Sequence, residues 1–229
     1  MSISERPSPR ISANKLAEYM TCAATRRRRI IRDSKYPPDY VVTRYNTFYD
    51  VAPQYASSRP LDEQIVTGAI ERISSKETKS EWEEETVQLN VDLFNGLLDL
   101  PDLCPIEDYS AIRTGDRRQS IVVAGVEISI RPELILRKDA RGGSVIGALK
   151  FYLPKTAPLN DISGQYLASL MHWYLEVEFP GESADPRHCF VYDVPSGEVW
   201  AGPRSFSRRR SDVEAACEEI ASRWSLISM

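Results

Sequence analysis

The stretch RPELILRKDARGGSVIGALKFYLPK, residues 131–155, constrains the fold more than any other part of the chain. It is typical of a β-strand, a turn at the Gly-Gly pair and a return strand. An acid, Glu133, stands near the start of the first arm, and Lys150 stands on the second arm. Because residues two apart on a strand share a face, Ala148 points the same way as Lys150. We therefore expect a hairpin that places an acid and a lysine on one sheet.

Helical periodicity dominates the chain before this hairpin. Helices are expected over 12–33, with Ser12 as the N-cap, and over 61–74 and 80–100, whereas residues 41–59 are expected to form a loop with at most one short strand. After the hairpin, we expect a helix capped by Asp161, a second hairpin turned at 195–197, and a closing helix capped by Ser211.

This order of elements predicts an α/β (α+β) fold, in which a central mixed sheet is flanked by helices. Residues 1–10 carry serine and proline without an apolar period, so we expect a flexible lead-in. Residues 11–229 are expected to form a single domain. Within it, 11–105 is the mostly helical part, and 120–229 contains the sheet core and the C-terminal helix.

Composition limits the classes of function. The net charge is -4, so any contact with nucleic acid must come from a local basic patch rather than from the whole surface. The four cysteines are scattered without a C-x-x-C pair, which favours a reducing, cytoplasmic setting. The longest apolar runs are far shorter than the ~20 residues that a membrane span needs, so no membrane partner is expected.

Four short motifs resemble the PD-(D/E)XK nuclease-like superfamily, in its RecB-like branch. They are the capped helix ISANKLAEYMTCAATRRRR, the strand IRPEL with Glu133, the strand GALK with Lys150, and the helix SGQYLASLMHWYL with Gln165. The resemblance covers roughly residues 11–32 and 121–225. It implies a restriction-endonuclease-like core and a role in DNA metabolism.

The resemblance also implies a damaged active site. In this superfamily two carboxylates hold Mg²⁺, and a lysine orients the attacking water or stabilises developing charge. Glu133, Lys150 and Gln165 match catalytic positions, and Glu133 matches a metal ligand, but Ala148 stands where the second acid belongs. A methyl group cannot bind Mg²⁺. If the chain is active, Mg²⁺ is the expected cofactor and Glu71, on a preceding helix, is the candidate for a displaced carboxylate; otherwise no cofactor is expected.

An iron-sulfur cluster, which some RecB-like proteins carry, is not expected. Those relatives have one cysteine near the N-terminal helix and three clustered near the C-terminus. Cys22 could match the first, but Cys217 stands alone in the C-terminal segment.

Two arginine clusters are candidates for phosphate contacts. The alternative is a solvated surface, since cations near a helix C-terminus are favourable in themselves. Four consecutive arginines also point all around a helix and cannot share one groove. Together the clusters could hold phosphates only if they lie side by side. The candidate nucleic-acid residues are Arg26, Arg27, Arg28, Arg29, Arg208, Arg209 and Arg210.

Three functions follow as hypotheses, and whether the chain is an enzyme stays open. The leading one is a degenerate PD-(D/E)XK-type protein with impaired or absent catalysis, which binds nucleic acid or serves in a DNA-processing or defence assembly. The second is an active Mg²⁺-dependent DNA nuclease that uses Glu133, Lys150 and a displaced carboxylate. The third is a non-catalytic protein-interaction scaffold. The expected partners are accordingly DNA or a larger protein assembly.

Overall fold

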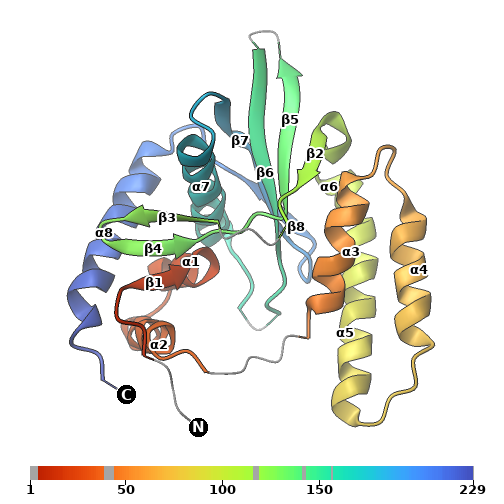
Figure 1. Cartoon of the computed structure of the whole chain (residues 1–229), viewed down its shortest axis with the longest axis horizontal. Coiled ribbons are helices and arrows are strands. Elements are labelled where there is room, and N and C mark those ends of the chain that lie inside the picture. Colours follow the sequence, from red (N-terminus) through yellow and green to blue (C-terminus); the bar gives the residue numbers. More distant parts are fainter. Residues whose placement is uncertain (1–4, 39–43, 116–118, 141–142, 156, 229) are drawn as a thin grey trace.

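The computed structural model describes residues 5–38, 44–115, 119–140, 143–155 and 157–228 (Figure 1). A five-stranded sheet stands at the centre of this part, and helices cover both of its faces. Parallel and antiparallel strand pairs both occur in it. The predicted α/β class, with a central mixed sheet flanked by helices, is confirmed.

The chain before the sheet is mostly helical. Its elements are β1 (Arg10–Ser12), α1 (Ala13–Thr21), α2 (Ala24–Lys35), α3 (Asn46–Ser57), α4 (Glu63–Ser74), α5 (Glu81–Leu98), α6 (Leu100–Leu103) and one 3-10 turn, Ile106–Asp108. The side chains of Ser12, Asp62 and Ser80 accept first-turn N–H groups of α1, α4 and α5, which otherwise lack a partner within the helix. The predicted cap of the first helix is thus confirmed.

The central sheet has the strand order β2-β5-β6-β7-β8. Its strands are β2 (Ser110–Arg113), β5 (Leu134–Ala140), β6 (Gly143–Tyr152), β7 (Ser183–Asp193) and β8 (Glu198–Ala201). β6 and β7 run parallel and are connected through α7 (Asp161–Glu178), while the other neighbouring pairs are antiparallel. Both predicted hairpins, β5–β6 and β7–β8, are confirmed; Gly142, in the first turn, lies outside the described residues.

A second, smaller sheet has the order β1-β4-β3, with β3 (Ser120–Val123) and β4 (Val126–Ser129). β1 runs parallel to β4, so the N-terminal segment is joined to the middle of the chain. This sheet packs near α7 and the closing helix α8 (Ser207–Trp224). The region that looks continuously β-like in the sequence therefore divides between two sheets.

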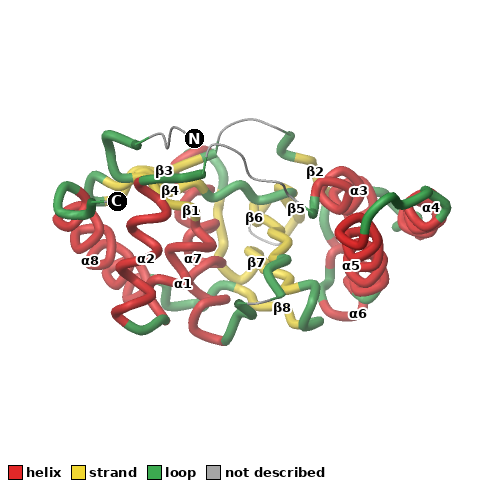
Figure 2. The backbone as a smooth tube through the Cα atoms, turned by 90° about the horizontal axis from the view of Figure 1, so that it is seen from below, coloured by secondary structure: helices red, strands yellow, loops and turns green. Residues whose placement is uncertain are grey.

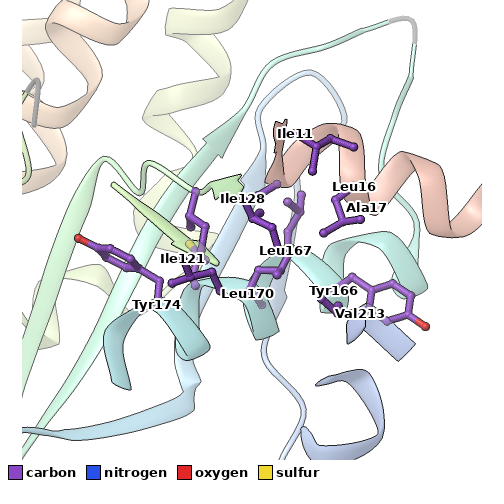
Figure 3. Packing of buried hydrophobic residues seen from close by; sticks show 14 of the residues in the cluster. Ile11, Leu16, Ala17, Ile121, Ile128, Tyr166, Leu167, Leu170, Tyr174 and Val213 are labelled. Atoms are coloured by element: carbon purple, nitrogen blue, oxygen red, sulfur yellow. The ribbon is translucent and has the colours of Figure 1, made fainter. Parts of the chain in front are cut away.

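Side chains of the central strands alternate between two hydrophobic cores. Ile135 and Ala148 point into a core that includes residues of α1, α2, α7, α8 and the small sheet. Figure 3 shows other side chains of this core, from the small sheet, α1, α7 and α8. Leu134 and Leu149 point into the other core, formed with α3, α4, α5 and α6. The two groups of helices lie on opposite sides of the strands (Figure 2). A cavity at the end of the sheet can therefore be lined from both sides.

Two expectations about the first helices are wrong. The helix expected over 12–33 is interrupted at Cys22 and Ala23, whose extended backbone separates α1 from α2. Residues 41–59 were expected to form a loop, but they contain α3. Its buried side chains recur at helical spacing on both sides of an internal proline; they are Phe48, Val51, Ala52, Tyr55 and Ala56.

The expected lead-in is held in place from Arg6 onward. The Arg6 backbone N–H donates to the Lys35 carbonyl, and the Trp224 indole donates to the Arg6 carbonyl. Arg10 then opens β1. Flexibility over 1–10 stays a prediction, and residues 1–4 lie outside the described residues.

The caps of the last two helices also differ from expectation. Asn160, not Asp161, caps α7, and its Oδ1 accepts the backbone N–H groups of Ile162 and Ser163. Asp161 instead accepts a hydrogen bond from the Trp200 indole at 3.1 Å. α8 begins at Ser207, one turn before the predicted cap, Ser211.

Within the described ranges, no helix is both long enough and apolar enough to cross a lipid bilayer.

Candidate nucleic-acid groove

Glu133 and Lys150 meet at one end of the β5–β6 hairpin. The register pairs Leu134 with Leu149, so its continuation places Glu133 opposite Lys150. Glu133 Oε1 lies 3.6 Å from Lys150 Nζ, and Oε2 accepts the Phe151 backbone N–H at 2.7 Å. Only 12% of the Glu133 side chain and 7% of the Lys150 side chain are exposed. The two candidate residues thus form a largely buried ion pair.

The backbone just before Glu133 is strained. Arg131 has a φ of 48°, which L-residues rarely adopt and which is unusual before a proline. Lys150 Nζ donates to the Arg131 carbonyl at 2.8 Å, and Thr114 Oγ1 donates to the Pro132 carbonyl at 2.7 Å. These bonds hold the turn from both sides. Strain of this kind is found most often at functional sites.

Two cavities, of about 870 and about 730 Å³, meet at this turn. One lies against α3 and the end of β2, and the other lies against the N-terminal segment and the start of α1. They share four lining residues, so we treat them as one space and call it the Glu133 groove. The shared residues are Tyr49, Asp50, Arg131 and Glu133.

The Glu133 groove is basic although the chain carries a net charge of -4. Among the described residues, five basic side chains line it, against two acidic ones, Asp50 and Glu133; the basic ones are Arg6, Arg10, Arg113, Arg131 and Lys150. Arg113 and Arg131 are exposed, and neither has an ion-pair partner in the part of the chain that the structure describes. Their charges are therefore open to a ligand.

Burial and neighbouring charges shift the pKa values of two groove residues, Arg6 and Glu133. Burial lowers the pKa of Arg6, and the nearby Arg10 charge acts in the same direction, whereas Glu127 opposes them. Burial raises the pKa of the Glu133 carboxyl, although Lys150 and the Phe151 N–H favour its ionised form. Protonation of Glu133 would make the groove more positive.

Ala148, where the resemblance would place a second acid, lies outside the groove. Ala148 is fully buried, points into the same core as Ile135, and lines neither cavity. Its neighbour on β7 is Cys189, which is also fully buried. An acid at this position would therefore be buried among apolar side chains.

Asp50 is the groove acid that the sequence did not reveal. It lies on α3, is exposed, and lines both cavities together with Glu133. Helical spacing around Phe48 and Tyr55 could have placed it, but residues 41–59 alternate poorly and are rich in Tyr, Thr and Asn, which favoured a loop. Across the described residues, no group of three or more His, Cys, Asp or Glu side chains is arranged to hold a metal ion.

Two predicted site residues lie elsewhere. Glu71 is exposed on α4, and it lines neither cavity of the groove. Gln165 lies in the first turns of α7, where its Oε1 accepts a hydrogen bond from Arg209 at 2.8 Å. The structure therefore brings Glu133 and Lys150 together, without Glu71 or Gln165 in the groove.

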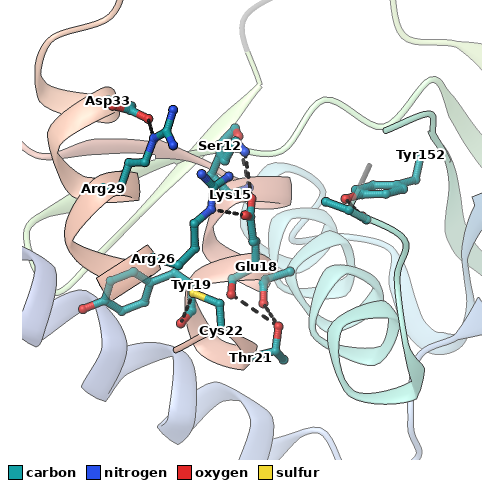
Figure 4. A network of polar contacts seen from close by, with 12 residues as sticks. Ser12, Lys15, Glu18, Tyr19, Thr21, Cys22, Arg26, Arg29, Asp33 and Tyr152 are labelled. Atoms are coloured by element: carbon teal, nitrogen blue, oxygen red, sulfur yellow. Dashed lines mark hydrogen bonds and ion pairs between the residues drawn. The ribbon is translucent and has the colours of Figure 1, made fainter. Parts of the chain in front are cut away.

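The α2 arginines mostly contact the protein's own acids (Figure 4). Arg26 donates to Glu18 at 2.6 Å, and Arg29 lies 3.5 Å from Asp33. Arg27 lies 3.9 Å from Glu219 on α8. Arg28 is exposed and lines a cavity of about 610 Å³ beside the C-terminal segment, together with Arg26, Arg29 and Arg32.

The α8 arginines form a separate group. Arg209 lies over the Tyr166 ring, and Arg210 pairs with Glu176 and lies over the Phe206 ring. Arg208 is exposed. Arg27 reaches α8 near Glu219, ten residues after Arg209 and hence ~15 Å along the helix. The two clusters therefore do not form one patch.

All four cysteines are free thiols, and three of them are buried. Burial raises the pKa of both Cys104 and Cys217 to about 12, so these thiols stay protonated at neutral pH.

Comparison with protein-family models finds none that matches the chain, and comparison with curated proteins finds no match either.

Proposed function

We propose that the protein binds nucleic acid in the Glu133 groove and that its nuclease-like core does not depend on a metal for this binding. The observation that carries the proposal is the pair of exposed, unpaired arginines, Arg113 and Arg131, in a groove of an acidic protein. Phosphates supply most of the binding free energy in such contacts, and unpaired arginines bind them well.

The start of α1 adds to this electrostatic field. Ser12 and Asn14 line the groove, and the first turn of α1 contains no acid. The helix dipole there favours an anion. Phosphates along a strand of nucleic acid could therefore contact α1 at one end of the groove and Arg113 at the other.

The surroundings of Ala148 support the absence of metal-dependent catalysis in this proposal. An acid at that position would be buried among apolar side chains, away from both cavities. Glu133 is then left with Lys150 as its close charged partner. We infer that the pair now holds the Arg131 turn in place.

A second candidate function is an active Mg²⁺-dependent nuclease, and the position of Asp50 favours it. Asp50 and Glu133 line the same two cavities, and carboxylates are the ligands that Mg²⁺ prefers. In this alternative Asp50, rather than Glu71, supplies the displaced carboxylate. Lys150 would stabilise the charge that develops on the phosphate.

One substitution separates the two functions. Glu133→Gln removes a negative charge from the groove but can still accept the Phe151 N–H. In EDTA, a groove that binds phosphate without metal should bind a labelled oligonucleotide about fivefold more tightly after this change. A nuclease should instead bind more tightly when Mg²⁺ is added, and the substitution should abolish that gain.

Cleavage assays complete the test. Linear, nicked and single-stranded DNA are incubated with Mg²⁺ or Mn²⁺, beside the Lys150→Ala variant. We expect no cleavage by the wild type. Cleavage that disappears in the variant would overturn the first proposal in favour of the second.

A further inference from the structure

The Glu133 groove offers aromatic and apolar surface beside its cations. Tyr49 is 37% exposed and Ile112 is 53% exposed, and both line the cavity that contains Arg113 and Arg131. Pro53 and Pro132 complete its apolar walls. A site for phosphate alone does not need this surface.

The Tyr49 ring rests on an ordered aromatic base. It meets the Phe48 ring edge-on, with the centroids 6.1 Å apart. Phe48 is fully buried, stacks on Phe94 at 5.7 Å, and meets Phe151 edge-on at 5.5 Å. The ring is therefore presented from a packed core, which lowers the entropy lost when a ligand stacks on it.

Two charged neighbours bracket this aromatic surface. Asp50 follows Tyr49 on α3, and Arg131 lies at the junction of the two cavities. The nearby Glu133 carboxylate and burial both raise the pKa of Tyr49, so its hydroxyl stays neutral beside a phosphate.

We propose that the groove recognises single-stranded nucleic acid, with an unpaired base against Tyr49 and Ile112 and its phosphates on Arg113 and Arg131. This inference rests on the proposed nucleic-acid binding and names the ligand class. In a duplex the base faces are stacked on their neighbours and cannot reach a side chain inside a cavity. An unpaired base can do so, and base–aromatic stacking tolerates any sequence.

The test uses fluorescence anisotropy in EDTA, with one labelled RNA probe beside three labelled DNA probes. They are an oligothymidylate of about 12 nucleotides, an abasic strand of the same length, and a duplex of that length. An oligouridylate arm distinguishes RNA from DNA as the source of the strand. We expect the wild type to bind the oligothymidylate more tightly than the abasic strand.

Tyr49→Ala should weaken oligothymidylate binding roughly tenfold and leave the abasic strand and the duplex unchanged. Tyr49→Phe keeps the ring and should stay within about twofold of the wild type. Ile112→Ser tests the other wall of the groove and should also weaken oligothymidylate binding. The Ile112 side chain is exposed enough for the fold to tolerate this change.

Different results would contradict the base-stacking proposal and the proposed function. If Arg131→Ala weakens binding but Tyr49→Ala does not, or if the abasic strand binds as well as the oligothymidylate, base stacking is wrong and the proposed function stands. If the wild type binds none of the probes, both proposals fail.

Discussion

The Glu133 groove and the arginine clusters of α2 and α8 are both rich in basic residues, but their cations have different partners. Arg26, Arg29 and Arg210 contact acids of the same or a neighbouring helix. Arg113 and Arg131 are exposed and line a cavity, without an ion-pair partner in the described ranges. We therefore expect separate arginines that the fold leaves unpaired in one groove to bind phosphate better than a run of arginines, several of which pair with acids.

The largest effect is expected at Ala148, which is fully buried. Ala148→Asp should lower the free energy of unfolding by about 3 kcal/mol, because the new carboxyl is buried without a designed partner. Urea denaturation measures this change, with Ala148→Val as an apolar control. A well-tolerated aspartate would mean that the groove extends to this residue.

A similar effect is expected when the buried ion pair is broken. Lys150→Met leaves the Glu133 carboxylate without its cation and should also destabilise the fold by about 3 kcal/mol. The double variant Glu133→Gln/Lys150→Met should recover most of the loss in urea denaturation. Equal destabilisation by the single and double variants would show that Lys150 acts through packing alone.

A smaller, pH-dependent effect is expected where Arg210 joins α8 to α7. His172 is buried: its Nε2 contacts the Ala184 carbonyl at 3.3 Å, and Arg210 lies 3.1 Å from Nδ1. Burial lowers the pKa of His172, and the Arg210 charge acts in the same direction, whereas Glu176 and Asp185 oppose them.

The unfolded chain therefore binds a proton at His172 more readily than the folded chain does. Stability should be complete above the ordinary pKa of 6.5 and should fall below it, by at most ~1.4 kcal/mol per pH unit from this residue. Burial also lowers the pKa of His188, so the comparison uses a His188→Asn background. In that background His172→Asn should flatten the dependence of stability on pH; an unchanged slope would contradict the assignment.

The smallest effect is expected on α2. Arg29 and Asp33 are both more than half exposed, so Arg29→Ala should change the free energy of unfolding by less than about 0.5 kcal/mol. Thermal denaturation of Arg29→Ala and of the buried-pair variant Lys150→Met compares the two losses of stability. A loss comparable to that of Lys150→Met would remove the distinction between the two regions.

The sequence predicted the groove only in part, for physical reasons. Strand alternation and the glycine turn were enough to bring Glu133 and Lys150 together, because a hairpin is a local structure. Glu71 was expected nearby, and its helix formed as predicted, but the direction in which a helix packs depends on tertiary contacts. Tyr49 and Asp50 were missed because residues 41–59, which alternate poorly and are rich in Tyr, Thr and Asn, suggested a loop. Helices tolerate proline when packing compensates, as the buried side chains of α3 do here.

The unpaired state of Arg113 could not be inferred from the sequence either. Whether a surface arginine meets an acid depends on which strands and helices the fold places beside it. Arg131 also depends on the strained turn, which is fixed by a hydrogen bond from a side chain nineteen residues away, Lys150.

The central claim, that nucleic acid binds in the groove and not at the arginine clusters, is tested most directly by the salt dependence of oligonucleotide binding. Two double variants are compared with the wild type: Arg113→Ala/Arg131→Ala in the groove and Arg28→Ala/Arg29→Ala on α2. We predict that the slope of log affinity against log salt concentration is less steep by about 1.4 in the groove variant. This difference corresponds to two lost phosphate contacts on a single strand. The α2 variant should keep the wild-type slope. A wild-type slope for the groove variant, together with a reduced slope for the α2 variant, would contradict the claim.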